Sequence, residues 1–368
     1  MLHDKIKRKS ASFLVSIFVL TGIFTNQNSY AQEIAVNNNT SSSFTIIVLP
    51  DTQYYSAYKS EIFLAQTKWI KEHAQELNIK IVLHEGDITN KNLLSEWFVA
   101  QRSMRVLDGV VPYVMTVGNH DMGNGGRINS RDTSLFNRYF PFERYENLEN
   151  FGGAFEDGKL DNAFYLFNAS NVKWLVLTLE FKPRDDVLEW ANSIAEEYSD
   201  RLIIVVTHSY LDERNRRTQN RIDRPKYGVV NDLRGANSGQ DMWGKFISLH
   251  ENIIMVFNGH HGGDGTGSLI SRGENGNFVY QTLANYQKMR NGGNGFLRIV
   301  TVDVVTHEIR VKTYSPYLAI YLNDLTNKFA YKNVQFLKDA TECVYYGGEN
   351  YYSIYDFIFF QCSGRFVL

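Results

Sequence analysis

Short apolar runs alternate along the chain with longer segments whose apolar positions recur every three or four residues. The runs at 44–49, 79–83 and 110–117 are rich in β-branched residues, so we expect strands there. Helical spacing in 60–77 and 95–107 predicts a helix between each pair of strands. This order is typical of a parallel or mixed sheet with helices on its faces.

The same alternation returns after an irregular stretch. Residues 121–160 are rich in Gly, Asn and Arg, and we expect a long loop or insertion there. The sequence shows no internal repeat, and the fold class it predicts is α/β. Beyond residue 160 the pattern predicts strands at 163–167, 172–179, 202–207 and 253–257, helices at 185–198 and 240–250, and then hairpins with glycine turns.

The first 31 residues have the features of a secretory signal peptide. Four basic residues precede an apolar run at 11–24, and Ser29 and Ala31 occupy positions −3 and −1 of a cleavage point. The run is shorter than the roughly 20 residues that span a membrane, which favours cleavage over an uncleaved anchor. We therefore expect a periplasmic or extracellular protein, in which the polar segment 32–43 is a linker to the fold.

Composition narrows the range of partners. Hydrophobic residues make up 43% of the chain and charged residues 21%, which is typical of a globular protein. The formal net charge is −2, so we expect no long-range attraction to nucleic acid or to an anionic membrane. Cys343 and Cys362 both lie near the carboxyl terminus, where they either form one disulfide of an exported protein or remain two free thiols.

Residues of metal-ligand type follow five of the predicted strands. In open α/β sheets, ligands bind beyond the carboxyl ends of the strands. One such residue alone is usually a turn former or a helix cap, but five at one edge indicate a centre of oxygen and nitrogen donors that suits Mn²⁺, Fe or Zn²⁺. Glycines before three of them would bring the backbone close to a ligand. The residues are Asp51, Asp87, Asn119 with His120 and Asp121, His208, and His260, and the glycines are Gly86, Gly118 and Gly259.

In this order, the motifs resemble those of the calcineurin-like metallophosphoesterases. Gln in the first motif resembles an exported bacterial branch of that family. The resemblance covers residues 44–315 and implies a four-layer α/β/β/α sandwich with mixed sheets. The aromatic-rich extension at 316–368 lies outside it, and its role is open. The motifs read D-T-Q at 51–53, G-D at 86–87, G-N-H-D at 118–121, His208, and G-H at 259–260.

The resemblance also implies two divalent metal ions, Mn, Fe or Zn. Water bound to such ions becomes hydroxide near neutral pH and attacks the phosphorus atom of a phosphoester substrate. The implied function is an exported metal-dependent phosphoesterase that hydrolyses a phosphate mono- or diester. The implied ligands are Asp51 and Gln53 for the first ion, the bridging Asp87, and Asn119, His208 and His260 for the second ion.

His120 and Asp121 would act on the leaving group. By the same resemblance, His120 is not a ligand but a general acid that protonates the leaving oxygen. Asp121 would orient the ring of His120, as a neighbouring carboxylate does for many histidines.

Two positions depart from the usual pattern of the family. Gly262 stands where most relatives have a second histidine, and Gln53 replaces the histidine of the first motif. The first site would then hold no imidazole, so we expect it to bind its ion more weakly than the second. In an extended segment, the side chain of His261 would point away from that of His260.

Several alternatives stay open at this stage. The departures would also fit a degenerate member that binds a phosphorylated ligand without turnover, and a nuclease or a cyclic-nucleotide phosphodiesterase would use the same motifs. The arginine-rich segment 210–240 is either a basic lid that recognises phosphate or a solvated surface loop. Asn285 and Gln287 lie either near the site or in the packing of a strand end.

Overall fold

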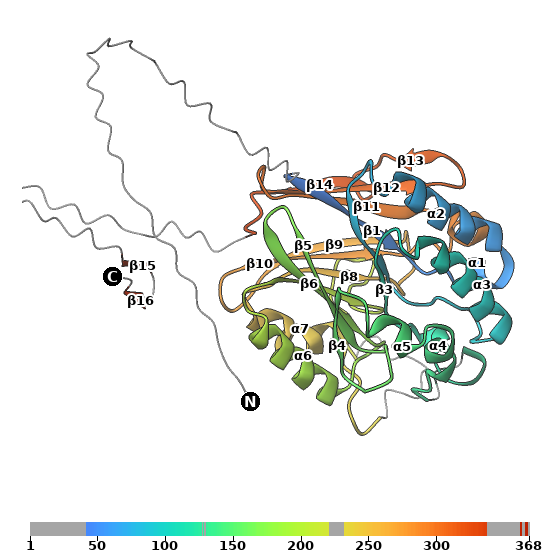
Figure 1. Ribbon diagram of the computed structural model, residues 1–368, viewed down its shortest axis with the longest axis horizontal. Coiled ribbons are helices and arrows are strands. Elements are labelled where there is room, and N and C mark those ends of the chain that lie inside the picture. The colour runs from blue at the N-terminus through green and yellow to red at the C-terminus, as the bar shows by residue number, and fades with distance from the viewer. Residues whose placement is uncertain are drawn as a thin grey trace, which may run out of the picture. The chain divides into compact units, whose positions relative to one another are not determined.

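Two stacked sheets, each covered by helices on its outer side, form the fold (Figure 1). The computed structural model describes residues 42–126, 128, 130–220 and 232–336, and the backbone of the strand pair at 361–362 and 365–366. The layers follow the order helices, sheet, sheet, helices, and both sheets are mixed. The predicted α/β/β/α sandwich is confirmed.

The first sheet, sheet A, joins three parallel strands to an antiparallel set. β1 pairs in parallel with β2, and β2 pairs in parallel with β3. On its other side β1 pairs antiparallel with β11, which leads to β12 and to the short strands that pair with β12. Their bounds are β1 Ser43–Leu49, β2 Ile79–His84, β3 Tyr113–Met115, β11 Leu297–Asp303, β12 Glu308–Ser315, β13 Ile320–Leu322 and β14 Lys328–Lys332.

The second sheet, sheet B, has a parallel centre and antiparallel edges. β6, β7, β8 and β10 are parallel neighbours, whereas β4 and β5 at one edge and β9 at the other run antiparallel to their partners. The bounds are β4 Phe151–Ala154, β5 Ala163–Ala169, β6 Val172–Leu179, β7 Leu202–Thr207, β8 Ile253–Asn258, β9 Thr266–Arg272 and β10 Phe278–Ala284.

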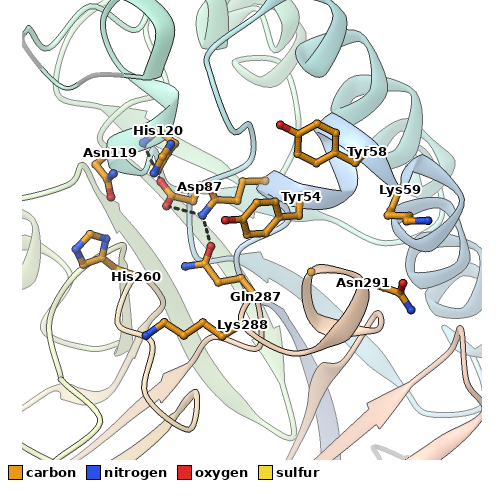
Figure 2. A pocket seen from close by; sticks show the side chains of 12 residues that line it. Tyr54, Tyr58, Lys59, Asp87, Asn119, His120, His260, Gln287, Lys288 and Asn291 are labelled. Carbon is orange, nitrogen blue, oxygen red and sulfur yellow. Dashed lines mark hydrogen bonds between the residues drawn. The ribbon is translucent and has the colours of Figure 1, made fainter.

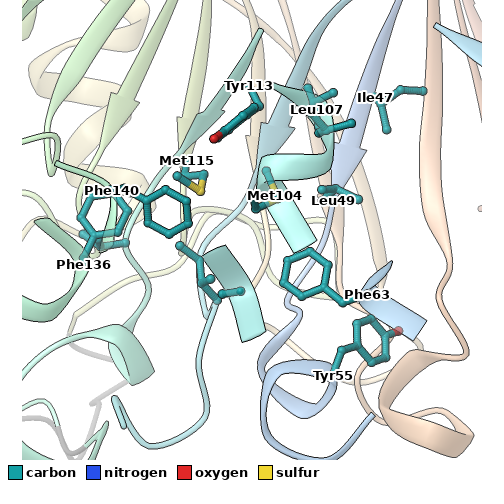
Figure 3. Close-up of a cluster of buried hydrophobic side chains, with 14 of the residues drawn as sticks. Ile47, Leu49, Tyr55, Phe63, Met104, Leu107, Tyr113, Met115, Phe136 and Phe140 are labelled. Carbon is teal, nitrogen blue, oxygen red and sulfur yellow. The ribbon is translucent and has the colours of Figure 1, made fainter. Parts of the chain in front are cut away.

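Strand β1 shows how the sequence pattern builds the layers. Ile46 and Val48 lie in the core between the sheets, whereas Ile47 and Leu49 pack against the helices outside sheet A. Successive side chains of a strand point to opposite faces, so an unbroken apolar run is buried on both sides. Figure 3 shows the outer cluster, in which Ile47 and Leu49 lie close to aromatic and methionine side chains of the covering segments.

Helices cover both outer faces. α2 and α3 lie over sheet A, and α6 and α7 lie over sheet B (Figure 1). Shorter helical turns connect the layers. The bounds are α2 Ser60–His73, α3 Leu94–Met104, α6 Asp185–Glu197, α7 Gly239–Lys245 and α8 Arg290–Gly293, with 3-10 turns η1 Arg105–Leu107, η2 Asn119–Asp121, η3 Asn124–Gly126 and η5 Ile247–Leu249.

The sequence pattern did not predict three short helices and one strand. The segment 121–160, expected to be irregular, contains α4 (Ser134–Tyr139), α5 (Phe142–Tyr145) and β4, and α1 (Gln53–Tyr58) begins at the last residue of the first motif. Helices of four to six residues depend on tertiary packing for their stability. Phe136 of α4 is buried in the cluster outside sheet A, which supplies that packing.

Strand β3 is shorter than the predicted run at 110–117. Pro112 has no N–H to donate to a neighbouring strand, although its carbonyl still accepts from Val82 N at 2.9 Å. Such a residue is tolerated at the edge of a sheet, and β3 is the edge strand of sheet A.

Several sequence predictions fall outside the described residues. The signal peptide 1–31, nearly all of the linker 32–43, and Cys343 belong to that group, and only the backbone of Cys362 is described. The disulfide therefore stays a prediction. Within the described part of the chain, no helix is both long and apolar enough to cross a membrane.

Candidate active site

The residues predicted from the strand ends meet at one edge of the two sheets. Asp51, Asp87 and Asn119 follow β1, β2 and β3 of sheet A, and His208 and His260 follow β7 and β8 of sheet B. All except His260 are fully buried. Parallel strands bring their carboxyl ends to the same edge, which explains why positions far apart in sequence lie together.

Three donor atoms converge on Nε2 of His208. Its Nε2 lies 3.2 Å from Asp87 Oδ1, 3.2 Å from Asn119 Oδ1 and 3.2 Å from His260 Nδ1. The ligand atoms of Asp87, His208 and His260 all lie within 4.8 Å of one another. Carboxylate, amide and imidazole donors at this spacing fit a divalent ion of borderline hardness.

The ring of His208 is held in the orientation that a metal ligand needs. Its Nδ1 lies 2.7 Å from the carbonyl oxygen of Glu85. Because a carbonyl only accepts, Nδ1 carries a proton and Nε2 faces the cluster. Such a contact behind a ligating histidine is typical of metal sites.

The two carboxylate oxygens of Asp87 contact different residues of the site. Oδ1 accepts from the backbone N of His120 at 2.9 Å and lies beside His208, whereas Oδ2 accepts from Gln53 Nε2 at 3.3 Å. The carboxylate thus stands between the residues expected to hold the second ion and those expected to hold the first.

The charges of the cluster favour a cation. Burial opposes the charged form of Asp87, but the neighbouring His208 brings the pKa of Asp87 well below its usual range. Burial alone would lower the pKa of His208, yet Asp87 and Asp51 raise it to about 10. Burial and the charge of His208 keep the pKa of His260 low, so its imidazole lone pair is available to a ligand. Asp87 is therefore the carboxylate whose charge draws a cation to this point, whereas burial raises the pKa of Asp51 well above its usual range.

Amide groups surround Asp51. Its Oδ2 accepts from Asn285 Nδ2 at 3.0 Å and from Gln287 Nε2 at 3.4 Å, and its Oδ1 accepts from the backbone N of His260 at 3.2 Å. Gln53 also contacts Gln287. Of the two alternatives for Asn285 and Gln287, the structure therefore places both beside the site.

Two glycines permit the close approach of the strand-end loops. A Cβ on Gly118 would lie 2.2 Å from the backbone N of Asp87, and a Cβ on Gly259 would lie 2.1 Å from Asp51 Oδ1. No side chain fits either position, so Gly118 lets the loops after β2 and β3 meet, and Gly259 lets the loops after β1 and β8 meet.

The expected contact between Asp121 and the ring of His120 is wrong. His120 Nδ1 lies 2.6 Å from the carbonyl oxygen of Asn90. The carboxylate of Asp121 instead accepts from the backbone N of Gly118, Ile88 and Thr89 at 2.9, 3.0 and 2.8 Å. Because these backbone donors hold its carboxylate, Asp121 joins the loops after β2 and β3, and the carbonyl oxygen of Asn90 is the group that contacts the ring of His120.

Burial makes Asp121 sensitive to protonation. Burial and the neighbouring Asp87 raise the pKa of Asp121 to about 6, against the opposing effect of the backbone donors. Loss of its charge would weaken the contacts that hold these loops together.

His261 does not point away from His260. His260 has a left-handed backbone with φ of 68°, so the segment is turned rather than extended. The two rings lie 4.7 Å apart and nearly perpendicular, and His261 Nε2 lies 3.1 Å from Ser209 Oγ. The alternation rule for strands fails here because β8 ends at Asn258.

Lys288 fills the space beside Gly262. A Cβ on Gly262 would lie 2.3 Å from Lys288 Cε and 2.4 Å from Lys288 Nζ. The end of a lysine side chain therefore covers the position at which the resemblance implied a histidine. Sequence reasoning gave Lys288 no role, although it directly follows Gln287.

A pocket of about 620 Å³ opens over the cluster. Figure 2 shows Asp87, Asn119, His120 and His260 at one side of this pocket and Tyr54 at another. Sequence reasoning missed the outer lining, because those residues carry no metal-ligand signature. The missed residues are Tyr54, Tyr58, Lys59, Lys288 and Asn291.

The described arginines of segment 210–240 have internal partners. Arg214 and Arg216 both pair with the buried Asp212 at 2.8 Å, and Arg234 pairs with Asp232 at 3.0 Å. Arg217 lies over the ring of Trp243, 4.2 Å from its centroid. These contacts give the four arginines a structural role. Residues 221–231 of the segment lie outside the described part.

Residues 44–261 match the calcineurin-like phosphoesterase family, and this segment carries every predicted ligand. The chain belongs to this family. Within this family segment, the buried cluster of Asp87, His208 and His260 is suited to a divalent metal ion.

A curated relative supports the same assignment. The chain is 30% identical over 283 residues to the uncharacterized protein YvnB of Bacillus subtilis (strain 168). The match covers 75% of this chain and 20% of YvnB, so the chain spans about a fifth of the length of that relative.

Two solved structures whose names state an activity align with most of this chain. The purple acid phosphatase PPD1 from yellow lupin (Lupinus luteus) seeds has a TM-score of 0.48 and 12% identity, over 79% of this chain and 54% of that one. The NAD nucleotidase NadN of Haemophilus influenzae has a TM-score of 0.39 and 14% identity, over 79% of this chain and 50% of that one.

Proposed function

We propose that this metallophosphoesterase is an exported enzyme that hydrolyses a phosphate mono- or diester. The observation that carries the proposal is the convergence of Asp87, Asn119, His208 and His260 donor atoms beneath a pocket that also contains His120. A bound divalent ion, Mn, Fe or Zn, would supply a Lewis acid and activate the attacking water.

The donor atoms divide between two ions in this proposal. Asn119, His208 and His260 would hold the second ion, Asp51 and Gln53 would hold the first, and Asp87 would contribute one oxygen to each. The supporting observation for the bridge is that Asp87 Oδ1 lies beside His208 and Asp87 Oδ2 beside Gln53.

The first site should bind its ion more weakly than the second. It has no imidazole, and the two oxygens of Asp51 already accept from His260, Asn285 and Gln287. An ion must displace or reorient these donors. Titration of the chelated protein with Mn²⁺, with bound metal counted, should show one tight and one weaker ion; two ions of equal affinity would contradict this.

His120 donates the proton that the leaving oxygen requires. Its Nδ1 is held by the carbonyl oxygen of Asn90 at 2.6 Å, which leaves Nε2 as the donating atom. Asp121 contributes by holding the loops of β2 and β3 in place, as a positioning residue.

A panel of phosphoesters with several metals tests the proposal. We expect turnover of an aryl phosphate, an aryl phosphodiester or both when Mn²⁺ is added. If no member of the panel is hydrolysed and a phosphate analogue still binds, the protein is a phospho-ligand-binding protein and not an enzyme. Preference for a nucleic acid or a cyclic nucleotide would identify the nuclease or phosphodiesterase alternative.

Export rests on the first 31 residues alone. Their basic, apolar and small-residue segments support cleavage after Ala31. The mature protein should begin at Gln32 when the full chain is expressed in a bacterium, and amino-terminal sequencing of the purified protein decides this.

A further inference from the structure

Two tyrosines form a wall of the pocket beyond the metal cluster. Tyr54 and Tyr58 lie one turn apart on α1, with rings 6.3 Å apart and tilted by 26°. They are 38% and 62% exposed, whereas Tyr55 between them is buried. Because α1 begins at Gln53, this wall stands at a fixed distance from the proposed ligands.

The loop after β10 packs against the wall. A Cβ on Gly292 would lie 2.4 Å from Tyr54 Cβ, so the backbone of this loop is packed directly against Tyr54. Gly292 has φ of 74°, a conformation that glycine adopts without strain. The backbone N of Gly295 donates to Tyr55 Oη at 2.9 Å, which ties the loop to α1. Contacts within the protein therefore fix the part of α1 that carries the wall.

The wall lies on the side of the proposed general acid. Asn90 Nδ2 donates to Tyr58 Oη at 3.3 Å, and the carbonyl oxygen of the same Asn90 holds His120 Nδ1. Figure 2 shows Tyr58 and His120 along the same edge of the pocket, with Lys288 at the opposite edge. A group that leaves after protonation by His120 would therefore depart alongside the two rings.

We propose that the natural substrate is a phosphoester whose leaving group carries a planar aromatic ring that stacks on Tyr54 and Tyr58. This rests on the proposed function, because it assigns the leaving group to the side of His120. Exposed aromatic rings beside a phosphate site bind the faces of bases with little dependence on sequence. Asn291 and Lys59 also line this pocket, and the Asn291 amide oxygen and the Lys59 ammonium are suited to hydrogen bonds with heteroatoms at the edge of such a ring.

The test compares substrates that differ only in the ring. Adenosine 5′-phosphate and ribose 5-phosphate share the same leaving oxygen, and benzyl phosphate and cyclohexylmethyl phosphate form a second pair. Each is supplied as the monoester and as its methyl diester. We expect kcat/KM to favour the aromatic member of at least one pair about tenfold or more. Preference in the first pair alone identifies a nucleobase, and preference in both identifies any aryl group.

Variants then test whether Tyr54 and Tyr58 cause the preference for the aromatic substrate. Tyr54→Ala with Tyr58→Ala should bring the ratio within a pair close to one, whereas the matching Phe variants should keep it. Tyr321→Ala, at a tyrosine of β13 with 48% exposure outside this pocket, should also keep it. Equal kcat/KM within both pairs, or a ratio unchanged by the Ala variants, would overturn the inference.

Failure of this inference differs from failure of the proposed function. If ribose 5-phosphate or cyclohexylmethyl phosphate is hydrolysed but no aromatic preference appears, only the inference fails. If no phosphoester is hydrolysed, the proposed function fails. In that case, calorimetric dissociation constants of adenosine 5′-phosphate and ribose 5-phosphate still decide whether the tyrosines bind a ring.

Discussion

At the scale of single residues, His120 has the clearest expected role. Its ring contacts the carbonyl oxygen of Asn90 and lies in the pocket, outside the set of converging ligand atoms. His120→Ala should lower turnover by about 10²–10⁴, the usual contribution of a general acid, without reducing bound metal. His73→Ala on α2 is a matched control. Near wild-type turnover of His120→Ala would remove His120 from the mechanism.

The contact between Gly262 and Lys288 can also be tested at this scale. Gly262→Ala would place a methyl group 2.4 Å from Lys288 Nζ and so displace the ammonium. If this ammonium binds the phosphoryl group, inhibition by inorganic phosphate should weaken about tenfold, as it should in Lys288→Met. Gly244→Ala on α7, where a Cβ meets nothing within 4 Å, is the control. An unchanged inhibition constant in Lys288→Met would show that Lys288 takes no part in binding phosphate.

At the scale of elements, the buried Asp161 links α4 to the start of β5. Its carboxylate accepts from Thr133 Oγ1 at 2.6 Å and from Asn137 Nδ2 at 2.7 Å. Burial nevertheless raises the pKa of Asp161 to about 6, above the usual value near 3.8. The folded state therefore binds the proton more tightly than the unfolded state does, and the stability this confers is present below pH 4 and lost as pH rises through 6.

Substitution of Asp161 should flatten this pH dependence. The shift corresponds to about 3 kcal/mol of unfolding free energy across pH 4 to 6. Asp161→Asn should lose that slope in denaturant unfolding, whereas Asp157→Asn, an exposed residue of the same connection, should retain it. The same slope in Asp161→Asn and in the wild type would mean that Asp161 is not the responsible group.

The sequence predicted long elements better than short ones. The strands at 44–49, 172–179 and 202–207 were confirmed because an apolar run buried on both faces is visible without tertiary context. α1, α4 and α5 have four to six residues, and contacts from distant segments stabilise them. Periodicity cannot reveal a helix of that length.

At the scale of the whole molecule, the site joins the two sheets. Sheet A supplies Asp51, Asp87 and Asn119, and sheet B supplies His208 and His260. The strand-end rule predicted these residues because parallel strands share one edge. It could not predict Lys288 or the tyrosine wall, since their place depends on loops that pack against each other only in the folded chain.

The most direct test of the central claim is turnover as a function of bound metal. Protein freed of metal by chelation is titrated with Mn²⁺, and hydrolysis of an aryl phosphate and an aryl phosphodiester is measured at each count of bound ions. We predict no turnover without metal, a rise that saturates at no more than two ions per chain, and no recovery in His208→Ala. Equal turnover by the metal-free and the reloaded protein would contradict a metal-dependent phosphoesterase.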